Sequence, residues 1–203
     1  MNLTVRWRRS RWWRLSEDPE TYTRSRTTFA WFVRAGKKIG AVRFNEIDAG
    51  MEEDNVFLLS MDDNSFSDGQ LALTLCSEWR DVGFTVGCYG PIVEVAEAWI
   101  HPHFAPGGSW ADVATMLLAR LFADRSILVL KAFPLEYEGT TPAGSPSPTA
   151  LLSRQRAMVR HYRRTLNARS LPGRPGKEGW MWLANPRCRD VLPRPKYNPR
   201  LKM

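Results

Sequence analysis

One stretch of the sequence, residues 98–118, combines residue types that suit the binding of an anion. An apolar strand runs into His-Pro at 101–102, a loop with Gly107 and Gly108 follows, and an apolar helix then carries Leu-Leu. At the start of such a helix, free backbone N–H groups and the positive end of the helix dipole attract a negative charge. The order of these elements predicts an anion site between the strand and the helix.

Other reactive side chains form weaker patterns. His101, His103 and His161 could supply three metal ligands, but no cysteine or carboxylate lies beside them at metal-ligand spacing, and we predict no metal. No Ser/His/Asp pattern stands out. The three cysteines are scattered and odd in number, which predicts a reducing, cytoplasmic compartment without a disulfide framework.

The N-terminal segment, residues 1–14, is rich in arginine and tryptophan. Arginines for phosphates and aromatic rings for stacking are typical of a contact with single-stranded nucleic acid. However, Leu3, Val5 and Trp7 alternate with polar residues. We therefore prefer a first β-strand that carries its arginines on the solvent face.

The net charge of +8 is unevenly distributed along the 203 residues. Residues 1–14 carry five arginines and no acid, and residues 154–203 carry 14 Lys or Arg against two acids, whereas residues 15–153 have a net charge of −9. The pattern predicts a polyanion contact through 1–14 and 187–203, or an internal match between the ends and the centre. No apolar run approaches the roughly 18 residues of a membrane helix, and the N-terminus lacks a secretory signal.

Hydrophobic periodicity predicts alternating strands and helices, and hence an α/β fold with a mixed sheet. In strand 92–100, strict alternation places Glu94 and Glu97 on opposite faces. The unit 92–133 is strand–helix–strand, which favours parallel strands. Residues 1–185 are expected to form a single domain, followed by a basic, Pro-rich tail over 186–203. The expected elements are a hairpin over 27–44 with its turn at 35–38, loops over 47–55, 138–149 and 173–179, strands 56–61, 84–88, 127–133 and 180–184, and helices 68–82 (capped by Ser67 and Gln70), 109–123 and 151–166.

Two segments carry a resemblance to a known family. The strand, His-Pro, Gly-containing loop and Leu-Leu helix of residues 98–118 resemble the core signature of the GNAT N-acetyltransferase superfamily. This signature is a strand ending in hydrophobic-x-Pro, a pyrophosphate loop of pattern Arg/Gln-x-x-Gly-x-Gly/Ala, and a helix with Leu-Leu. The helix around Tyr162 and the strand Trp180-Met-Trp-Leu resemble the family's closing elements. The resemblance covers about residues 28–184 in order of elements. It implies a mostly antiparallel central sheet flanked by helices.

The resemblance implies that the chain binds acetyl-CoA and transfers the acetyl group to a primary amine. The thioester carbonyl would lie near Trp99 and Ile100 on a splayed strand, and Tyr162 would return a proton to the leaving thiolate. Glu94 or Glu97 would be the base for the incoming ammonium, with burial raising its basicity. The residues by themselves also allow a plain core role for Tyr162 and a solubility role for the two glutamates.

The pyrophosphate loop departs from the family pattern. With Leu-Leu aligned, only Ala114 fits; Ser109 replaces the basic or amide residue, and Asp112 replaces a glycine. Asp112 could instead complete a helix cap with Ser109, or the loop could be shifted to 106–111. The cofactor-binding residues implied at the loop are Gly107, Gly108, Ser109, Trp110, Ala111, Asp112, Val113 and Ala114.

Three functional hypotheses follow from these features. The first is an acetyl-CoA-dependent N-acetyltransferase with an unidentified amine acceptor, no membrane contact and a homodimer left open. The second is a catalytically lapsed GNAT-like binding module, which Asp112 motivates. The third is a nucleic-acid-binding protein that acts through its basic ends.

Overall fold

An eight-stranded sheet organises the part of the chain that the structure describes. The structure is a computed structural model, described for residues 3–19, 21–48, 61, 66–75, 91–101, 103, 116–117, 120–122, 127–132 and 147–184. Its elements are β1 (Leu3–Arg9), β2 (Trp13–Arg14), β3 (Arg24–Arg34), β4 (Lys37–Asp48), α2 (Phe66–Leu73), β5 (Ile92–Ile100), β6 (Ile127–Lys131), α4 (Pro148–Leu166), β7 (Arg169–Ser170), α5 (Gly173–Lys177) and β8 (Trp180–Ala184).

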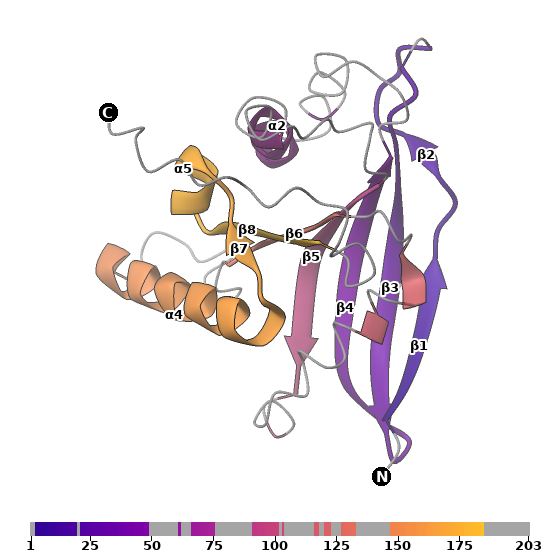
Figure 1. Ribbon diagram of the computed structural model, residues 1–203. Helices are drawn as coiled ribbons and strands as arrows, with labels where there is room; N and C mark the ends of the chain where they lie inside the picture. The colour runs from indigo at the N-terminus through magenta and orange to yellow at the C-terminus, as the bar shows by residue number, and fades with distance from the viewer. Residues whose placement is uncertain are drawn as a thin grey trace.

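The strand order is β1-β3-β4-β5-β6-β8-β7, and the short β2 pairs with β3. Every neighbouring pair is antiparallel except β5 and β6, which are parallel. Helices lie beside this sheet, with α4 alongside the strands that follow β5 and α2 near the end of β4 (Figure 1). The predicted α/β class with a mostly antiparallel sheet is confirmed at this level.

The β3–β4 hairpin confirms the strongest local prediction. Its two turn residues, Ala35 and Gly36, both have positive φ (50° and 76°), which is the conformation that a two-residue hairpin turn requires. The strands are longer than expected. The predicted loop over 47–55 is wrong at its start, because Ile47 and Asp48 continue the pairing with β3.

The N-terminal strand preferred from the sequence is also confirmed, since β1 pairs with β3 along its whole length. Arg6 and Arg8 are exposed, as expected for the solvent face of a strand. Arg9 has its side chain on the other face, where it is partly buried.

Two apolar cores lie on the two faces of the sheet. One joins Phe32, Phe44 and Leu128 of the sheet to Leu117 and to the buried stripe of α4. The other joins Ile47, Ile92, Val129 and Trp182 to α2. Periodicity predicts an apolar stripe of Leu151, Met158, Val159, Tyr162 and Leu166 on this helix, and the last four of these residues pack in the first core.

The ends of α4 have conventional caps. The Ser147 hydroxyl accepts a hydrogen bond from the Ala150 N–H, and Pro148 follows at the first helical position. Asn167 ends the helix in the left-handed conformation, with its N–H donating to the Tyr162 carbonyl. These caps explain why the helix begins three residues before the predicted start.

Three further predictions of local structure are wrong. α2 begins at Phe66, so Ser67 lies inside the helix and is not its cap. Met61, assigned to a strand over 56–61, is helical and buried. The predicted loop over 173–179 contains the short helix α5. Tertiary contacts hold residues 173–177 in this helix, since Pro175 is buried and Gly176 lies against the Leu171 carbonyl.

Several other predictions concern residues outside the described ones. They include the strand over 84–88, most of the helix over 109–123 (of which 116–117 and 120–121 are helical), the loop over 138–146 and the tail over 186–203. Among the helices of the described residues, none has the length and apolar character needed to cross a membrane.

Two glycines in different surroundings give a test of the fold. A Cβ at Gly176 would lie 1.9 Å from the Leu171 carbonyl oxygen, whereas a Cβ at Gly36 would meet nothing within 4 Å. We expect Gly176→Ala to lower the free energy of unfolding by about 3 kcal/mol through main-chain displacement. Gly36→Ala should lower it by about 1 kcal/mol, from the left-handed conformation alone. Urea denaturation of both variants measures the difference, and equal losses would contradict the close approach at Gly176.

Candidate active site

The residues predicted to form the site lie on β5 and α4. Glu94, Glu97, Trp99 and Ile100 belong to β5, and Tyr162 belongs to α4. The predicted pyrophosphate loop lies outside the described residues, and this applies to Gly107, Gly108, Ser109, Trp110, Ala111, Asp112, Val113 and Ala114.

A β-bulge in β5 changes which face each residue occupies. Phe44 pairs with Val95, and the next pair along β4 is Arg43 with Glu97, so Ala96 is an extra residue. Alternation restarts after the bulge. The prediction that Glu94 and Glu97 lie on opposite faces is therefore wrong, and both lie on the face opposite α4.

Both glutamates have polar partners on β4. The Asn45 side-chain amide donates to Glu94 Oε2 at 2.9 Å, and Arg43 Nη2 lies 2.8 Å from Glu97 Oε1. The Glu97 side chain is 53% exposed, so this ion pair is in contact with solvent. A solvated pair of this kind is weak, which leaves the Glu97 carboxylate open to exchange partners.

β5 extends beyond its pairing with its parallel neighbour. Within the described residues, β5 pairs with β6 from Ile92 to Val95, and β5 itself continues to Ile100. At the end of β5, the His101 N–H donates to the Ile39 carbonyl at 2.9 Å. Because N–H groups alternate in direction along a strand, the Ile100 N–H is directed to the opposite edge, on the β6 side. The Ile100 N–H is thus a backbone donor on the edge of β5 that lies beyond its last described pair with β6.

Tyr162 is partly buried and packs against the core between α4 and the sheet. Its carbonyl accepts backbone hydrogen bonds from Asn167 and Ala168, which fixes the end of the helix around it. Burial raises the pKa of the Tyr162 phenol above its usual value, because desolvation disfavours the phenolate. The hydroxyl therefore stays protonated throughout the neutral range, and it can act only as a proton donor or a hydrogen-bonding group.

Of the three histidines considered as metal ligands, His101 and His103 follow the end of β5, whereas His161 lies on α4. The His103 N–H donates to Nδ1 of His101 at 3.2 Å. Within the described ranges, no group of three His, Cys, Asp or Glu residues could hold a metal ion.

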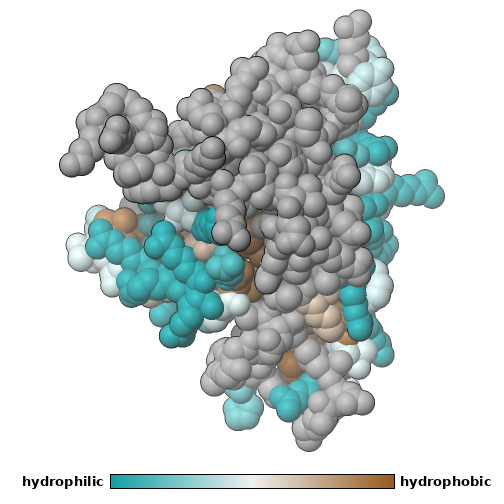
Figure 2. All heavy atoms as spheres, in the orientation of Figure 1, coloured by the Kyte–Doolittle hydropathy of each residue, from teal (hydrophilic) through white to brown (hydrophobic). Residues whose placement is uncertain are grey.

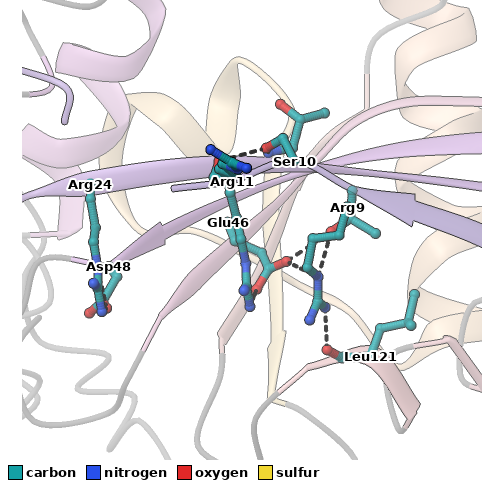
Figure 3. Close-up of polar contacts among 10 residues, drawn as sticks. Arg9, Ser10, Arg11, Arg24, Glu46, Asp48 and Leu121 are labelled. Atoms are coloured by element: carbon teal, nitrogen blue, oxygen red, sulfur yellow. Dashed lines mark hydrogen bonds and ion pairs between the residues drawn. The ribbon is translucent and has the colours of Figure 1, made fainter. Parts of the chain in front are cut away.

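A buried carboxylate that the sequence analysis missed lies on the α4 face of β4. Glu46 is 1% exposed and contacts two arginines: Arg26 Nη2 lies 2.6 Å from Oε2, and Arg9 Nε lies 3.1 Å from Oε1. The Thr28 hydroxyl donates to Oε1 at 2.9 Å, and Arg9 also donates to the Leu121 carbonyl. Figure 3 shows Arg9 between the Glu46 carboxylate and the Leu121 carbonyl. We call Arg9, Arg26, Thr28 and Glu46 the Glu46 cluster.

Aromatic rings and burial set the electrostatics of the Glu46 cluster. The Trp12 ring lies under the Arg26 guanidinium at 4.2 Å and under that of Arg24 at 4.9 Å. Burial lowers the pKa of Arg9, an effect that Glu46 opposes and Arg26 reinforces. Arginine nonetheless remains charged in proteins. Glu46 is engaged on both oxygens, so the cluster joins strands and is not available as a base.

Removal of the buried charge tests the structural role of the Glu46 cluster. Glu46→Gln leaves Arg9 and Arg26 partly buried with no counter-charge, and we expect it to lower the free energy of unfolding by about 3–5 kcal/mol. The matched control is Asp48→Asn, which breaks the solvent-exposed pair with Arg24 and should cost under about 1 kcal/mol. Chemical denaturation monitored by circular dichroism measures both, and similar small losses would contradict the structural role.

The comparisons with known proteins do not add to this geometry. A scan against protein-family models finds no match, and searches of curated proteins and of solved structures find no similar protein. The interpretation of the site therefore depends on the residues and contacts described above.

Proposed function

We propose that the protein is an N-acyltransferase of the GNAT type that transfers an acetyl group from acetyl-CoA to a primary amine. The observation that carries the proposal is that β5 continues to Ile100 after its last described pair with β6 at Val95, with the Ile100 N–H directed to that edge. Such an edge can donate a hydrogen bond to a thioester carbonyl that lies between the two strands.

The surrounding elements support the same interpretation. β5 follows three antiparallel strands, pairs in parallel with β6, and is connected to it through a segment with helical residues at 116–117 and 120–121. α4 then carries Tyr162, and β8 is the closing strand that the resemblance expects at Trp180-Met-Trp-Leu.

The proposed reaction gives each group a distinct task. The Ile100 N–H stabilises the negative charge that develops on the carbonyl oxygen. The amine nitrogen forms a bond to the acetyl carbon and releases a proton to solvent, and the carbon–sulfur bond breaks. Tyr162 donates its proton to the departing thiolate and is reprotonated from solvent.

Glu97 suits the role of base better than Glu94. Glu94 lies where β5 is still paired with β6, at the level of Val129, and its carboxylate accepts the Asn45 amide. Glu97 lies beyond the last β5–β6 pair of the described residues and is half exposed. It can take the proton of the incoming ammonium through water when Arg43 moves aside.

The cofactor diphosphate requires a positive environment. The backbone N–H groups of residues 107–114 remain the predicted site for it. A second source of positive charge is the solvent face of α4, which has exposed arginines and no acidic residue. Figure 2 shows this helix covered by hydrophilic side chains. The scattered cysteines suit a cytoplasmic setting for the reaction.

Calorimetric titration of the full chain with acetyl-CoA tests the proposal directly. We expect saturable binding in the micromolar to low millimolar range that is typical of enzyme substrates, with CoA competing for the same site. Absence of binding at millimolar acetyl-CoA would contradict the proposal and favour the lapsed binding module.

Substitution of the proposed proton donor tests the mechanism. We expect Tyr162→Phe to lower kcat about 100-fold, because the thiolate then leaves unprotonated, with acetyl-CoA affinity unchanged. The matched control is Tyr22→Phe, which removes a phenol that is 70% exposed and should not change the rate. If Tyr162→Phe alters thermal stability but not acetyl transfer to an amine panel, Tyr162 has only a core role.

A further inference from the structure

The sheet exposes aromatic side chains on the face opposite α4. One row across the strands consists of Arg8, Phe29, Arg43 and Glu97, and the neighbouring row consists of Arg6, Trp31, Ala41 and Trp99. Phe29 is 48% exposed, Trp99 is 49% exposed, and Trp31 is half-buried between them. We call Arg6, Arg8, Phe29, Trp31 and Trp99 the aromatic face.

The spacing of the rings is fixed by the strands. Phe29 and Trp31 are two residues apart on β3, which separates them by about 7 Å along the strand. This is about twice the 3.4 Å step of stacked bases in one strand of a duplex. Trp99 lies two strands from Trp31, at about 10 Å across the sheet. An extended chain of bases, but not a stacked duplex, can place successive bases on such rings.

The charge of the aromatic face is positive. Arg6 and Arg8 extend from β1 on the same face as the rings, and both are exposed. Glu97 is the one acidic residue in these two rows, and Arg43 pairs with it. The whole chain has a net charge of +8. These features complement a phosphate backbone better than an apolar or acidic partner.

We propose that the aromatic face binds single-stranded nucleic acid, with bases stacked on Phe29, Trp31 and Trp99 and phosphates contacted by Arg6 and Arg8. Base–aromatic stacking combined with a basic track is the general mode of single-strand binding. The face does not include Trp12, because its ring packs against Arg24 and Arg26 near the Glu46 cluster. The binding does not depend on acyl transfer.

Fluorescence anisotropy of a short labelled oligouridine titrated with the full chain tests this site. We expect binding that weakens steeply between about 50 and 200 mM salt, and weaker binding of a duplex of equal length. Phe29→Ala should lower the affinity about 10-fold, and Phe29→Tyr should retain it, because a phenol ring still stacks. Leu152→Ala, which removes an equally exposed apolar side chain from α4, should have no effect.

The phosphate contacts have their own matched pair of variants. Arg8→Gln should reduce the slope of log affinity against log salt by about 0.7, the value for one phosphate contact on a single strand. Arg156→Gln, an equal change of charge at an exposed position on α4, should leave the slope unchanged.

Four results would overturn the proposal. They are absence of binding at low salt, binding that Phe29→Ala leaves intact, an equal loss with Arg156→Gln, and a dimer that Phe29→Ala converts to a monomer in sedimentation. The last result would assign the face to contact between copies of the chain. Acetyl-CoA binding measured on Phe29→Ala separates this proposal from the proposed enzymatic function, since Phe29 has no part in acyl transfer.

Discussion

The buried carboxylate of Glu46 is the constraint on which the N-terminal half of the sheet depends. Burial of a charge is unfavourable by several kcal/mol unless partners compensate it, and the partners here come from β1 and β3. Apolar alternation alone would tolerate a slip of two residues between these strands. Such a slip would separate the Glu46 carboxylate from Arg9, Arg26 and Thr28, so these contacts fix the register of the strands. Through the Leu121 carbonyl, Arg9 extends the constraint to the chain segment that precedes β6.

The sequence contained these residues but not their arrangement. If the one-to-one pairing of β3 and β4 next to the turn at Ala35 and Gly36 continued along the hairpin, Asn45 would lie opposite Arg26. An irregularity between Phe32 and Val33 shifts the pairing by one residue and brings Glu46 there instead. The bulge at Ala96 has a similar effect on Glu97. Bulges arise from the packing of a strand against both neighbours. They cannot be predicted from the alternation of apolar and polar residues along the strand.

Elements with a strong local signal could be predicted. The stripe of α4 and the strands β5, β6 and β8 follow from periodicity alone, and so does the position of Tyr162 on a buried stripe. The sequence does not decide the role of Tyr162, because a phenol on such a stripe can serve packing and proton donation equally well. α5 could not be predicted, since its Gly and Pro residues are typical of a turn, and the close approach of Gly176 to Leu171 becomes visible only in three dimensions.

The pairing of the strands also changes the interpretation of the uneven charge along the sequence. Part of the acidic centre is matched internally, with Glu46 paired to Arg9 from the basic N-terminus, Asp48 to Arg24, and Glu97 to Arg43. Arginines that meet these acids contribute little to the field outside the molecule. The exposed positive charge of the described residues is spread over several elements, including Arg6 and Arg8 of β1, Lys37 and Lys38 at the hairpin turn, and the solvent face of α4. Of these groups, Arg6 and Arg8 lie in the same rows as the exposed rings of Phe29 and Trp99. Stacking on these rings can therefore add to the attraction of the charges on that face, which distinguishes it from the arginines of α4.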